Sequence, residues 1–317
     1  MQASASPGLP RWRLVGTFFL AAAAVSTASI VTRAAQNEQA PSLVIAAWRL
    51  SLASLVLTPF VLLRHHGELT QLTRAQIGLT LVSGTMLALH FASWITSLEY
   101  TSVVTSVVLV TTNPVFVALM TPIFLREKLS PTMITTVVVA TLGGIIVSAV
   151  GTAGDAPHQN APLFGALLAV VGAICVAAYF IIGRRLRASL SVIPYIWMTY
   201  GAGAIVLCGV VLAARLPVAG LSLNAYVFMS FLGLVPQLIG HSSYNYLLRF
   251  LSAAFVSLLV LVEPIGTTIL AMIVFKGKEY PVPLQYVGAA LILGALVFAG
   301  RTESPSAGRV EVEPGTE

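Results

Sequence analysis

Residues 102–125 read SVVTSVVLVTTNPVFVALMTPIFL, and residues 252–275 read SAAFVSLLVLVEPIGTTILAMIVF. Each stretch is apolar and long enough to cross a bilayer as a helix, which takes about 20 mostly apolar residues. Each also carries a proline near its middle, Pro114 in the first and Pro264 in the second, 150 residues further along the chain. A fixed offset of this kind predicts that the chain contains two copies of one structural unit.

The same offset aligns polar and aromatic side chains, which coincide by chance less readily than aliphatic ones in such an apolar chain. Asn113 and Glu263, which directly precede the two prolines, are counterparts. The other aligned pairs are Ser93 with Ser243, Trp94 with Tyr244, Leu98 with Leu248, Tyr100 with Phe250, Ser102 with Ser252, Leu109 with Leu259 and Val110 with Val260.

The composition of the whole chain places it in a membrane. Of its 317 residues, 57% are hydrophobic and 9% are charged, whereas soluble domains carry about 25% charged residues. The net charge of +6 is spread singly and in small groups between apolar runs, which argues against a nucleic-acid-binding face. Cys175 and Cys208 both lie in apolar runs and are too few for a disulfide framework or a zinc site.

Ten apolar runs are candidates for membrane spans, and each should be a helix because lipid cannot satisfy backbone polar groups. They cover roughly 14–35, 43–63, 76–98, 102–125, 132–151, 162–184, 192–214, 223–248, 251–275 and 283–300. The first follows Arg11 and Arg13 as a signal peptide's apolar core would, but it is longer than the usual core of about 7–15 residues. We therefore interpret it as a retained first span.

The placement of lysine and arginine predicts that both termini are cytoplasmic, because cytoplasmic loops carry the excess of these residues. With the N-terminus inside, only Arg33, Arg215, Lys276 and Lys278 fall outside, and Arg49 lies within a span. The residues predicted to be inside are Arg11, Arg13, Arg64, Arg74, Arg126, Lys128, Arg184, Arg185, Arg187, Arg249, Arg301 and Arg309.

The spans form two halves of five, and because five is odd the second half enters the membrane from the opposite side. Such inverted repeats are common in secondary transporters, whose substrate site lies near the midplane between the repeats. The expected divisions are a cytoplasmic N-terminal segment (1–13), a first five-helix repeat (14–151), an inter-repeat loop (152–161), a second five-helix repeat (162–301) and a disordered cytoplasmic tail (302–317).

Four motifs resemble those of the EamA family of the drug/metabolite transporter superfamily. They are Ala47-Trp48-Arg49-Leu50 in the second span, Asn113-Pro114 through Leu125-Arg126-Glu127-Lys128-Leu129 in the fourth span and its exit loop, Leu261-Val262-Glu263-Pro264 in the ninth span, and Lys278-Glu279 with Gln285 and Gly288 at the start of the tenth. The segment 275–279 departs from the family, which usually has a Gly-Glu pair directly after the ninth span. The resemblance covers residues 14–300.

The resemblance implies an all-α membrane protein with ten transmembrane helices, arranged as two inverted five-helix repeats around a central cavity. Spans 1–4 and 6–9 would line the cavity, with spans 5 and 10 at the periphery. Members of the family move small metabolites such as amino acids, nucleosides or drugs. The resemblance indicates transport strongly and the substrate only weakly.

Polar and ionisable side chains within spans are costly, so they usually face an interior or a cavity and are candidates for function. Nine such residues are predicted to bind substrate or couple its transport: Arg49, His90, Trp94, Asn113, Tyr179, Gln237, His241, Tyr244 and Glu263. Each has a structural alternative, since a buried histidine or tyrosine often only packs in the core and serines on these spans often only allow close helix packing.

Individual roles differ among these candidates. Glu263, beside Pro264, is suited to bind an amine or carry a coupling proton, or else to patch the helix kink. Arg49 is suited to bind a substrate carboxylate, or else to pair with Glu99 or extend towards the outer surface. His90 with Trp94, and the stripe that contains His241, would suit a moderately polar organic ligand.

The leading hypothesis is a secondary transporter that moves a small organic metabolite by alternating access, with export as the expected direction. The chain lacks phosphate-binding, nucleophile-elbow and metal-binding motifs, so we expect no enzyme activity, no cofactor and no metal. A membrane-embedded enzyme acting on a lipid or amphiphile, and a channel, are the alternatives. The expected setting is the bacterial inner (cell) membrane, with a small-molecule substrate, the lipid bilayer and protons as partners, no nucleic acid, and a monomeric or homodimeric state.

Overall fold

The structure is a computed structural model that describes residues 10–101, 103–149, 161–274 and 282–302. Every element in these ranges is a helix. In chain order they are α1 (Arg11–Val25), α2 (Ala28–Asn37), α3 (Ser42–Arg64), α4 (His66–Thr70), α5 (Arg74–Tyr100), α6 (Val103–Val110), α7 (Asn113–Met120), η1 (Thr121–Leu125), α8 (Pro131–Ala149), α9 (Pro162–Arg187), α10 (Val192–Ala213), α11 (Leu223–Leu232), η2 (Gly233–His241), α12 (Ser242–Leu247), α13 (Ala253–Val260), α14 (Glu263–Val274) and α15 (Pro283–Thr302).

Several sequence predictions fall outside the described residues. These are nearly all of the inter-repeat loop (152–161) and of the tail (302–317), the first nine residues of the N-terminal segment (1–13), and the charges Lys276 and Lys278 together with the unusual loop that contains them.

Apolar helices long enough to cross a membrane account for most of the described chain. By length and composition, nine runs qualify within the described residues, and a further apolar helix over Pro131–Val147 is shorter. Each of the ten predicted runs is mostly helical over its described residues, and the shorter helix is α8, in the predicted fifth span.

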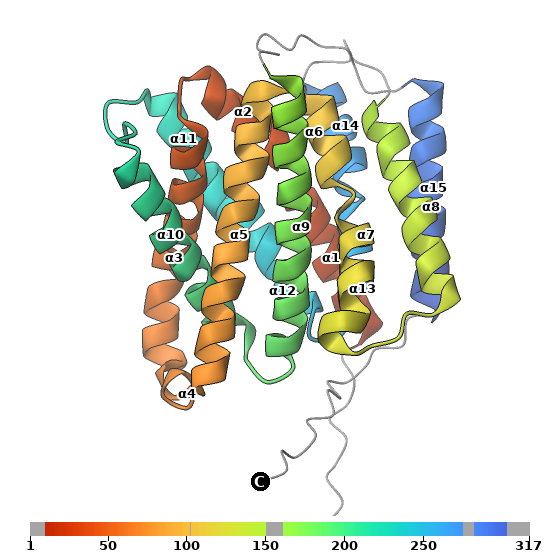
Figure 1. The fold of residues 1–317 in the computed structure, drawn as a ribbon, viewed down its shortest axis with the longest axis horizontal. Coiled ribbons are helices and arrows are strands. Elements are labelled where there is room, and N and C mark those ends of the chain that lie inside the picture. Colours follow the sequence, from red (N-terminus) through yellow and green to blue (C-terminus); the bar gives the residue numbers. More distant parts are fainter. Residues whose placement is uncertain (1–9, 102, 150–160, 275–281, 303–317) are drawn as a thin grey trace, which may run out of the picture.

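The helices form one bundle in which the two halves of the chain interleave (Figure 1). Helix α5 packs against α9 and α10, α3 packs against α10, α1 packs against η2, and α8 packs against α15 at one edge of the bundle. Most of the extensive helix contacts thus join the first half to the second. Neither half encloses a complete core by itself.

The fourth and ninth spans are each broken, at positions that are 150 residues apart. Helix α6 ends at Val110 and α7 begins at Asn113, whereas α13 ends at Val260 and α14 begins at Glu263. The proline that follows has no N–H to donate to the preceding turn, so the helix cannot continue unchanged. The prediction of one continuous helix per run is therefore wrong for these two spans.

Side chains add hydrogen bonds at the break in the fourth span. The Val110 carbonyl, which Pro114 leaves without its usual backbone donor, accepts from Asn113 Nδ2 at 3.3 Å. Thr111 Oγ1 and Thr112 Oγ1 donate at 2.8 Å and 2.6 Å to the Val107 and Leu109 carbonyls, which also accept backbone N–H groups. Lipid offers no hydrogen bonds, so a break at this depth persists only where protein or water supplies them.

Two other spans depart from a single α-helix. The first span is interrupted at Ser26 and Thr27, between α1 and α2. The eighth span passes through the π-helical segment η2, which contains Pro236. A π-helical turn places one extra residue in the helix and often occurs at functional sites.

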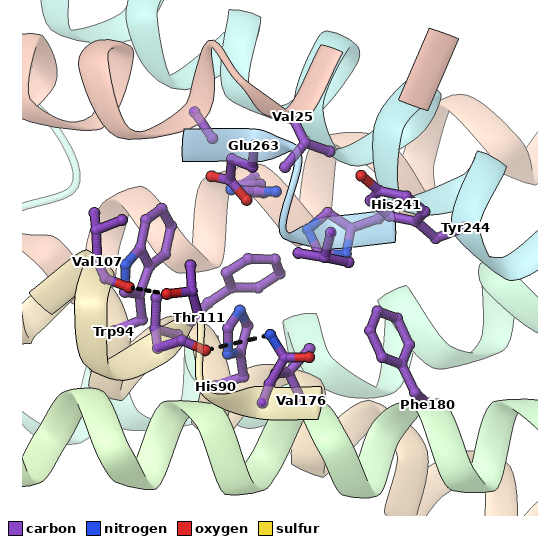
Figure 2. A pocket seen from close by; sticks show the side chains of 16 residues that line it. Val25, His90, Trp94, Val107, Thr111, Val176, Phe180, His241, Tyr244 and Glu263 are labelled. Atoms are coloured by element: carbon purple, nitrogen blue, oxygen red, sulfur yellow. Dashed lines mark hydrogen bonds between the residues drawn. The ribbon is translucent and has the colours of Figure 1, made fainter. Parts of the chain in front are cut away.

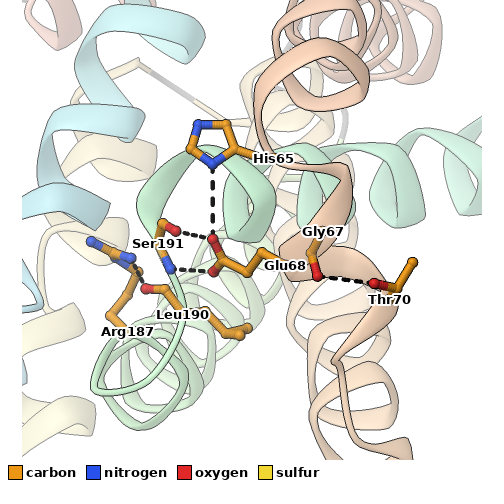
Figure 3. Close-up of polar contacts among 7 residues, drawn as sticks. All are labelled: His65, Gly67, Glu68, Thr70, Arg187, Leu190 and Ser191. Carbon is orange, nitrogen blue, oxygen red and sulfur yellow. Dashed lines mark hydrogen bonds and ion pairs between the residues drawn. The ribbon is translucent and has the colours of Figure 1, made fainter.

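Glutamates of the first half bind helix N-termini of the second half near both ends of the bundle. The Glu68 carboxylate, near the end of the bundle marked by α4 in Figure 1, accepts from the Ser191 backbone N–H at 2.6 Å and from the Ser191 hydroxyl, while His65 lies 3.8 Å away (Figure 3). Glu38, in the loop after the first span, accepts from the Ser222 hydroxyl at 2.6 Å. Ser191 and Ser222 are the N-caps of α10 and α11.

Two arginines of the basic group predicted at the cytoplasmic end of the sixth span are buried at the end of α9. Arg184 Nη1 donates to the Leu248 carbonyl at 2.9 Å, and Arg187 Nε donates to the Asn245 carbonyl at 3.0 Å. Cations suit the C-terminal end of a helix, where carbonyl groups lack partners. Helix α9 therefore extends three residues past the predicted end of the sixth span, at residue 184.

Glycines allow α5 and α10 to approach closely. A Cβ atom at Gly84 would lie 2.5 Å from the Thr199 carbonyl oxygen and 2.7 Å from the Ala202 Cβ. On the same helix, a Cβ atom at Gly78 would meet nothing within 4 Å.

We therefore expect Gly84→Ala to destabilise the protein, because the backbone of α10 must move away, at a cost of about 1–3 kcal/mol. Gly78→Ala should leave stability unchanged or raise it, because alanine favours a helix by about 0.5–1 kcal/mol over glycine. Thermal unfolding in detergent measures both variants. Equal melting temperatures for the two would show that α5 and α10 are not in tight contact.

Candidate functional site

A cavity lies in the centre of the bundle, beside the breaks in the fourth and ninth spans (Figure 2). Its volume is about 50 Å³, which is room for a few water molecules at about 10–15 Å³ each on this measure. The lining residues are Val25, Ala28, Arg49, His90, Phe91, Trp94, Val107, Val110, Thr111, Asn113, Val176, Phe180, His241, Tyr244, Val260 and Glu263.

The structure brings most of the predicted site residues to this one cavity. Those that line it are Arg49, His90, Trp94, Asn113, His241, Tyr244 and Glu263. Gln237 and Tyr179 are buried but are not among its lining residues. Gln237 reaches the cavity through Arg49, and the Tyr179 hydroxyl accepts a hydrogen bond from Asn245 Nδ2.

Arg49 on α3 is completely buried, with 0% of its surface exposed. Its Nε donates to Gln237 Oε1 at 2.8 Å, and its Cζ lies 4.0 Å from the centre of the Phe91 ring. That distance fits a cation–π contact. Its Nη1 and Nη2 atoms have no hydrogen-bond partner in the described part of the chain.

Both structural alternatives for Arg49 are wrong. The side chain does not extend to a membrane surface, because it is fully buried. It does not pair with Glu99 either, whose Oε1 accepts from the Ser42 hydroxyl at 2.5 Å. A charged group is tolerated at such a site only when other polar groups compensate its charge.

Glu263 is the first residue of α14, and its carboxylate points into the cavity (Figure 2). Arg49 lines the same cavity. An acidic side chain is favoured at the N-terminal end of a helix, where backbone N–H groups carry partial positive charge. The break in the ninth span thus supplies both the space for this carboxylate and a favourable position.

The two histidines contribute in different ways. His90 Nδ1 lies 2.8 Å from the Gly172 carbonyl, which can only accept, so this nitrogen carries the proton. The His90 ring stacks on Trp94 at 6.1 Å between ring centres. His241 contacts the edge of Phe91, and its Nδ1 has no partner in the described part of the chain.

Polar atoms without a protein partner concentrate at this cavity. Buried polar groups in proteins are almost always hydrogen-bonded, so each of these needs water or a polar solute. Among the described residues that line the cavity they are Arg49 Nη1 and Nη2, Trp94 Nε1, Asn113 Oδ1, His241 Nδ1 and the Tyr244 hydroxyl. The arrangement can therefore bind a compact polar molecule. Among the described residues no cluster of histidine, cysteine or acidic side chains could hold a metal ion.

Sequence reasoning missed the contact between the broken first and ninth spans. The Ser26 hydroxyl donates to the Glu263 carbonyl at 3.4 Å, and the Thr267 hydroxyl donates to the Ser26 carbonyl at 2.9 Å. A Cβ atom at Gly266 would lie 2.0 Å from Ser26 Oγ. The feature of the sequence that could have indicated this break is the polar pair Ser26-Thr27 inside an apolar run, because serine and threonine side chains compete for backbone hydrogen bonds.

Comparison with known proteins agrees with this architecture. The model of the EamA-like transporter family matches residues 13–149 and again residues 163–301. The chain therefore belongs to the EamA-like transporter family, and it is a multi-pass membrane protein. The earlier resemblance is confirmed.

The relatives carry no assigned substrate in their names. "Uncharacterized transporter YyaM" of Bacillus subtilis is 24% identical over 265 residues, covering 82% of this chain and 85% of that protein. An "Uncharacterized transporter" of Clostridium kluyveri is 24% identical over 224 residues, 70% of each chain. A solved crystal structure aligns with a TM-score of 0.73 at 19% identity, over 95% of this chain and 100% of that one, and shows the same fold.

The contact between Gly266 and Ser26 predicts that a substitution at Ser26 restores stability lost by a substitution at Gly266. Gly266→Ala should destabilise the protein by about 1–3 kcal/mol, because the new methyl group overlaps Ser26. Ser26→Gly removes both Ser26 atoms near that methyl group, so the double variant should recover most of the lost stability.

Thermal unfolding of the two single variants and the double variant tests this coupling. Gly209→Ala is the control, because a Cβ atom there meets nothing within 4 Å. Strictly additive effects of the two substitutions would contradict the contact.

Proposed function

We propose that this protein is a secondary transporter that moves a small organic metabolite across the cell (inner) membrane by alternating access, in the export direction. One observation carries the proposal. Arg49, His90, Asn113, His241 and Glu263, from five different spans, meet at one buried cavity beside two helix breaks. Polar groups are kept at this depth at a cost, which function at the site explains.

An arrangement of ten transmembrane helices as two inverted five-helix repeats is part of the proposal. The helix contacts support it, because exchanging the two halves maps the most extensive contacts onto one another. The contact of the third span with the sixth (α5 with α9) becomes that of the eighth with the first (η2 with α1). The contacts α3 with α10, α7 with α13 and α8 with α15 each map onto themselves.

Two related halves offer a route to alternating access. If each half can adopt the conformation of the other, the protein has two states of similar energy that open to opposite sides. The halves are not identical here, since the first span is broken at Ser26 and the matching part of the sixth is continuous. That difference gives the two states unequal energies.

The proposed orientation has both termini in the cytoplasm. Arg64 and Arg74 flank α4, and Arg301 lies in the last turn of α15. In antiparallel spans these ends face the same side of the membrane, as the excess of basic residues in cytoplasmic loops predicts.

The proposed roles follow the geometry of the cavity. Glu263 and Arg49 provide its charges, and His90, Trp94, Asn113, His241 and Tyr244 provide hydrogen bonds and ring surface. Gln237 positions Arg49, and Tyr179 supports the wall through Asn245. A proton is the proposed coupling ion, with Glu263 as its carrier. The other charged or titratable residues that line the cavity are Arg49, His90, His241 and Tyr244.

Reconstitution into proteoliposomes separates transport from the two alternative functions. A transporter should move a solute unchanged and saturably, and should exchange it between the two sides. A membrane enzyme would alter its solute, and a channel would pass ions far faster than a carrier. Either of those results would contradict the proposal.

The variant Glu263→Gln should fold normally but transport about tenfold more slowly, because a charge-assisted contact is lost. We expect wild-type flux to depend on pH between about pH 5 and 8 if Glu263 carries the coupling proton, and the variant should lose this dependence. Glu99→Gln is the matched control, since that carboxylate binds Ser42 away from the cavity. If Glu263→Gln transports like wild type throughout this range, Glu263 is only structural.

A further inference from the structure

Each half of the chain contains the same two hydrogen bonds, which join the end of its first span to the end of its third. We call the pair in the first half the first clamp and the pair in the second half the second clamp. We propose that each clamp is a gate: the first must break before the cavity opens to one side of the membrane, and the second before it opens to the other. This inference rests on the alternating access proposed above.

In the first clamp, two side chains near the end of the first span donate to carbonyl groups near the end of the third. Arg33 Nη2 donates to the Leu98 carbonyl at 3.2 Å, and Gln36 Nε2 donates to the Ile95 carbonyl at 3.0 Å. The clamp joins α2 to α5. A cation suits this place, because the C-terminal end of a helix carries partial negative charge.

The second clamp repeats these contacts in the same register, between α9 and the end of α12. Arg184 Nη1 donates to the Leu248 carbonyl at 2.9 Å, and Arg187 Nε donates to the Asn245 carbonyl at 3.0 Å. The acceptors lie 150 residues, and the donors 151 residues, beyond their counterparts in the first clamp. A pair of contacts that recurs at equivalent places in both halves belongs to the repeated unit.

The two clamps lie at opposite ends of the bundle. Gln76, in the first turn of α5, donates to the hydroxyl of Ser189, just after the end of α9, at 3.2 Å. The start of α5 and the end of α9 therefore share the end of the bundle that α4 marks in Figure 1. The first clamp, near the end of α5, lies at the other end, where Figure 1 shows α2. In the proposed orientation the first clamp is outer and the second is cytoplasmic.

Each clamp lies about one helical turn beyond the cavity. The cavity-lining residues that precede a clamp residue by four or five positions on the same span are Ala28, Trp94, Phe180 and Tyr244. That separation is about 6–8 Å along a helix. Both spans of a clamp thus continue from the wall of the cavity towards one membrane surface. While the clamp is intact, these two spans cannot move apart on that side.

Hydrogen bonds of this kind suit a contact that has to break and form again. When the spans separate, water can enter between them and bind the guanidinium and carbonyl groups that the clamp releases. Facing lipid, the same groups would stay unpaired at a high cost. Opening a clamp towards a water-filled entrance therefore exchanges one set of hydrogen bonds for another, and the net cost is modest.

The second clamp should hold more strongly than the first. Its donors Arg184 and Arg187 are 5% and 1% exposed, whereas the first clamp pairs a half-buried arginine with a glutamine. Arg184 also donates to the Arg249 carbonyl at 3.2 Å, and its Nε lies 3.9 Å from the Glu127 carboxylate. Hydrogen bonds from charged groups are about twice as strong as neutral ones. The cavity should therefore open more readily past the first clamp, to the outside.

The reactivity of a cysteine in the cavity tests the two gates. Val260 lines the cavity, so Val260→Cys, in a background with Cys175→Ala and Cys208→Ala, reports which side is open. A membrane-impermeant thiol reagent is applied to one side at a time of sealed vesicles with known protein orientation. The measured quantity is the ratio of the outer to the cytoplasmic reaction rate, and thermal unfolding checks that each variant is folded.

Arg33→Gln should raise this ratio about tenfold, because losing a charge-assisted hydrogen bond at the outer gate favours the outward-open state by roughly that factor. Arg184→Gln should lower the ratio by at least as much. The variant with both substitutions weakens both gates, so its ratio should lie between those of the single variants. Arg33→Lys and Arg184→Lys keep the charge but lose the planar fork, and they should shift the ratio in the same directions by less.

Controls and outcomes separate the gates from the function beneath them. Arg215→Gln and Arg185→Gln change exposed arginines near the outer and cytoplasmic ends and should leave the ratio unchanged. If the glutamine and lysine variants of a clamp leave the ratio unchanged, or shift it in the direction expected for the other clamp, that contact is structural and alternating access stands. If Val260→Cys with both clamps intact reacts from one side only, alternating access fails and the gates fail with it.

Discussion

The structure depends on a constraint that lipid imposes on proline. Inside a bilayer no water is available to satisfy a backbone group, so a proline that interrupts a helix leaves carbonyls that only protein or an enclosed water can bind. Pro114 and Pro264 each interrupt a helix in this way, one in the fourth span and one in the ninth. In the fourth span Asn113 Nδ2 donates to the Val110 carbonyl, which Pro114 leaves without its usual backbone donor. The cavity lies beside these breaks because the chain there is neither regular helix nor fully packed.

The charges follow from the same geometry. A fully buried arginine is expensive, and here Gln237 and the Phe91 ring offset only part of that cost. Glu263 at the start of α14 compensates the charge without an ion pair among the described residues. A buried site whose polar atoms lack partners should bind a solute that supplies those hydrogen bonds in preference to one that does not. An incomplete hydrogen-bond network thereby favours selective binding.

Much of this was accessible from the sequence. Hydropathy identified the helices, since only a helix satisfies its own backbone in lipid. The offset between Pro114 and Pro264 predicted a repeated unit, although the expectation of one helix per run did not include a break in either span. The cost of burying polar groups led to seven residues that line one cavity. The partners of Arg49 were not accessible, because Gln237 and Phe91 lie on other spans and nothing local sets their distance. The break at Ser26 was missed for a related reason, since no proline marks it and the contact that stabilises it comes from Gly266 and Thr267.

Access to the cavity from the two sides of the membrane tests the central claim most directly. Val110 and Val260 are equivalent in the two halves and both line the cavity. Each would be replaced by cysteine in a background that carries Cys175→Ala and Cys208→Ala, and treated with a membrane-impermeant thiol reagent from one side at a time. We predict that each cysteine reacts from both sides and that transported solute slows the reaction. Reaction of both cysteines from one side only, under all conditions, would contradict alternating access at this cavity.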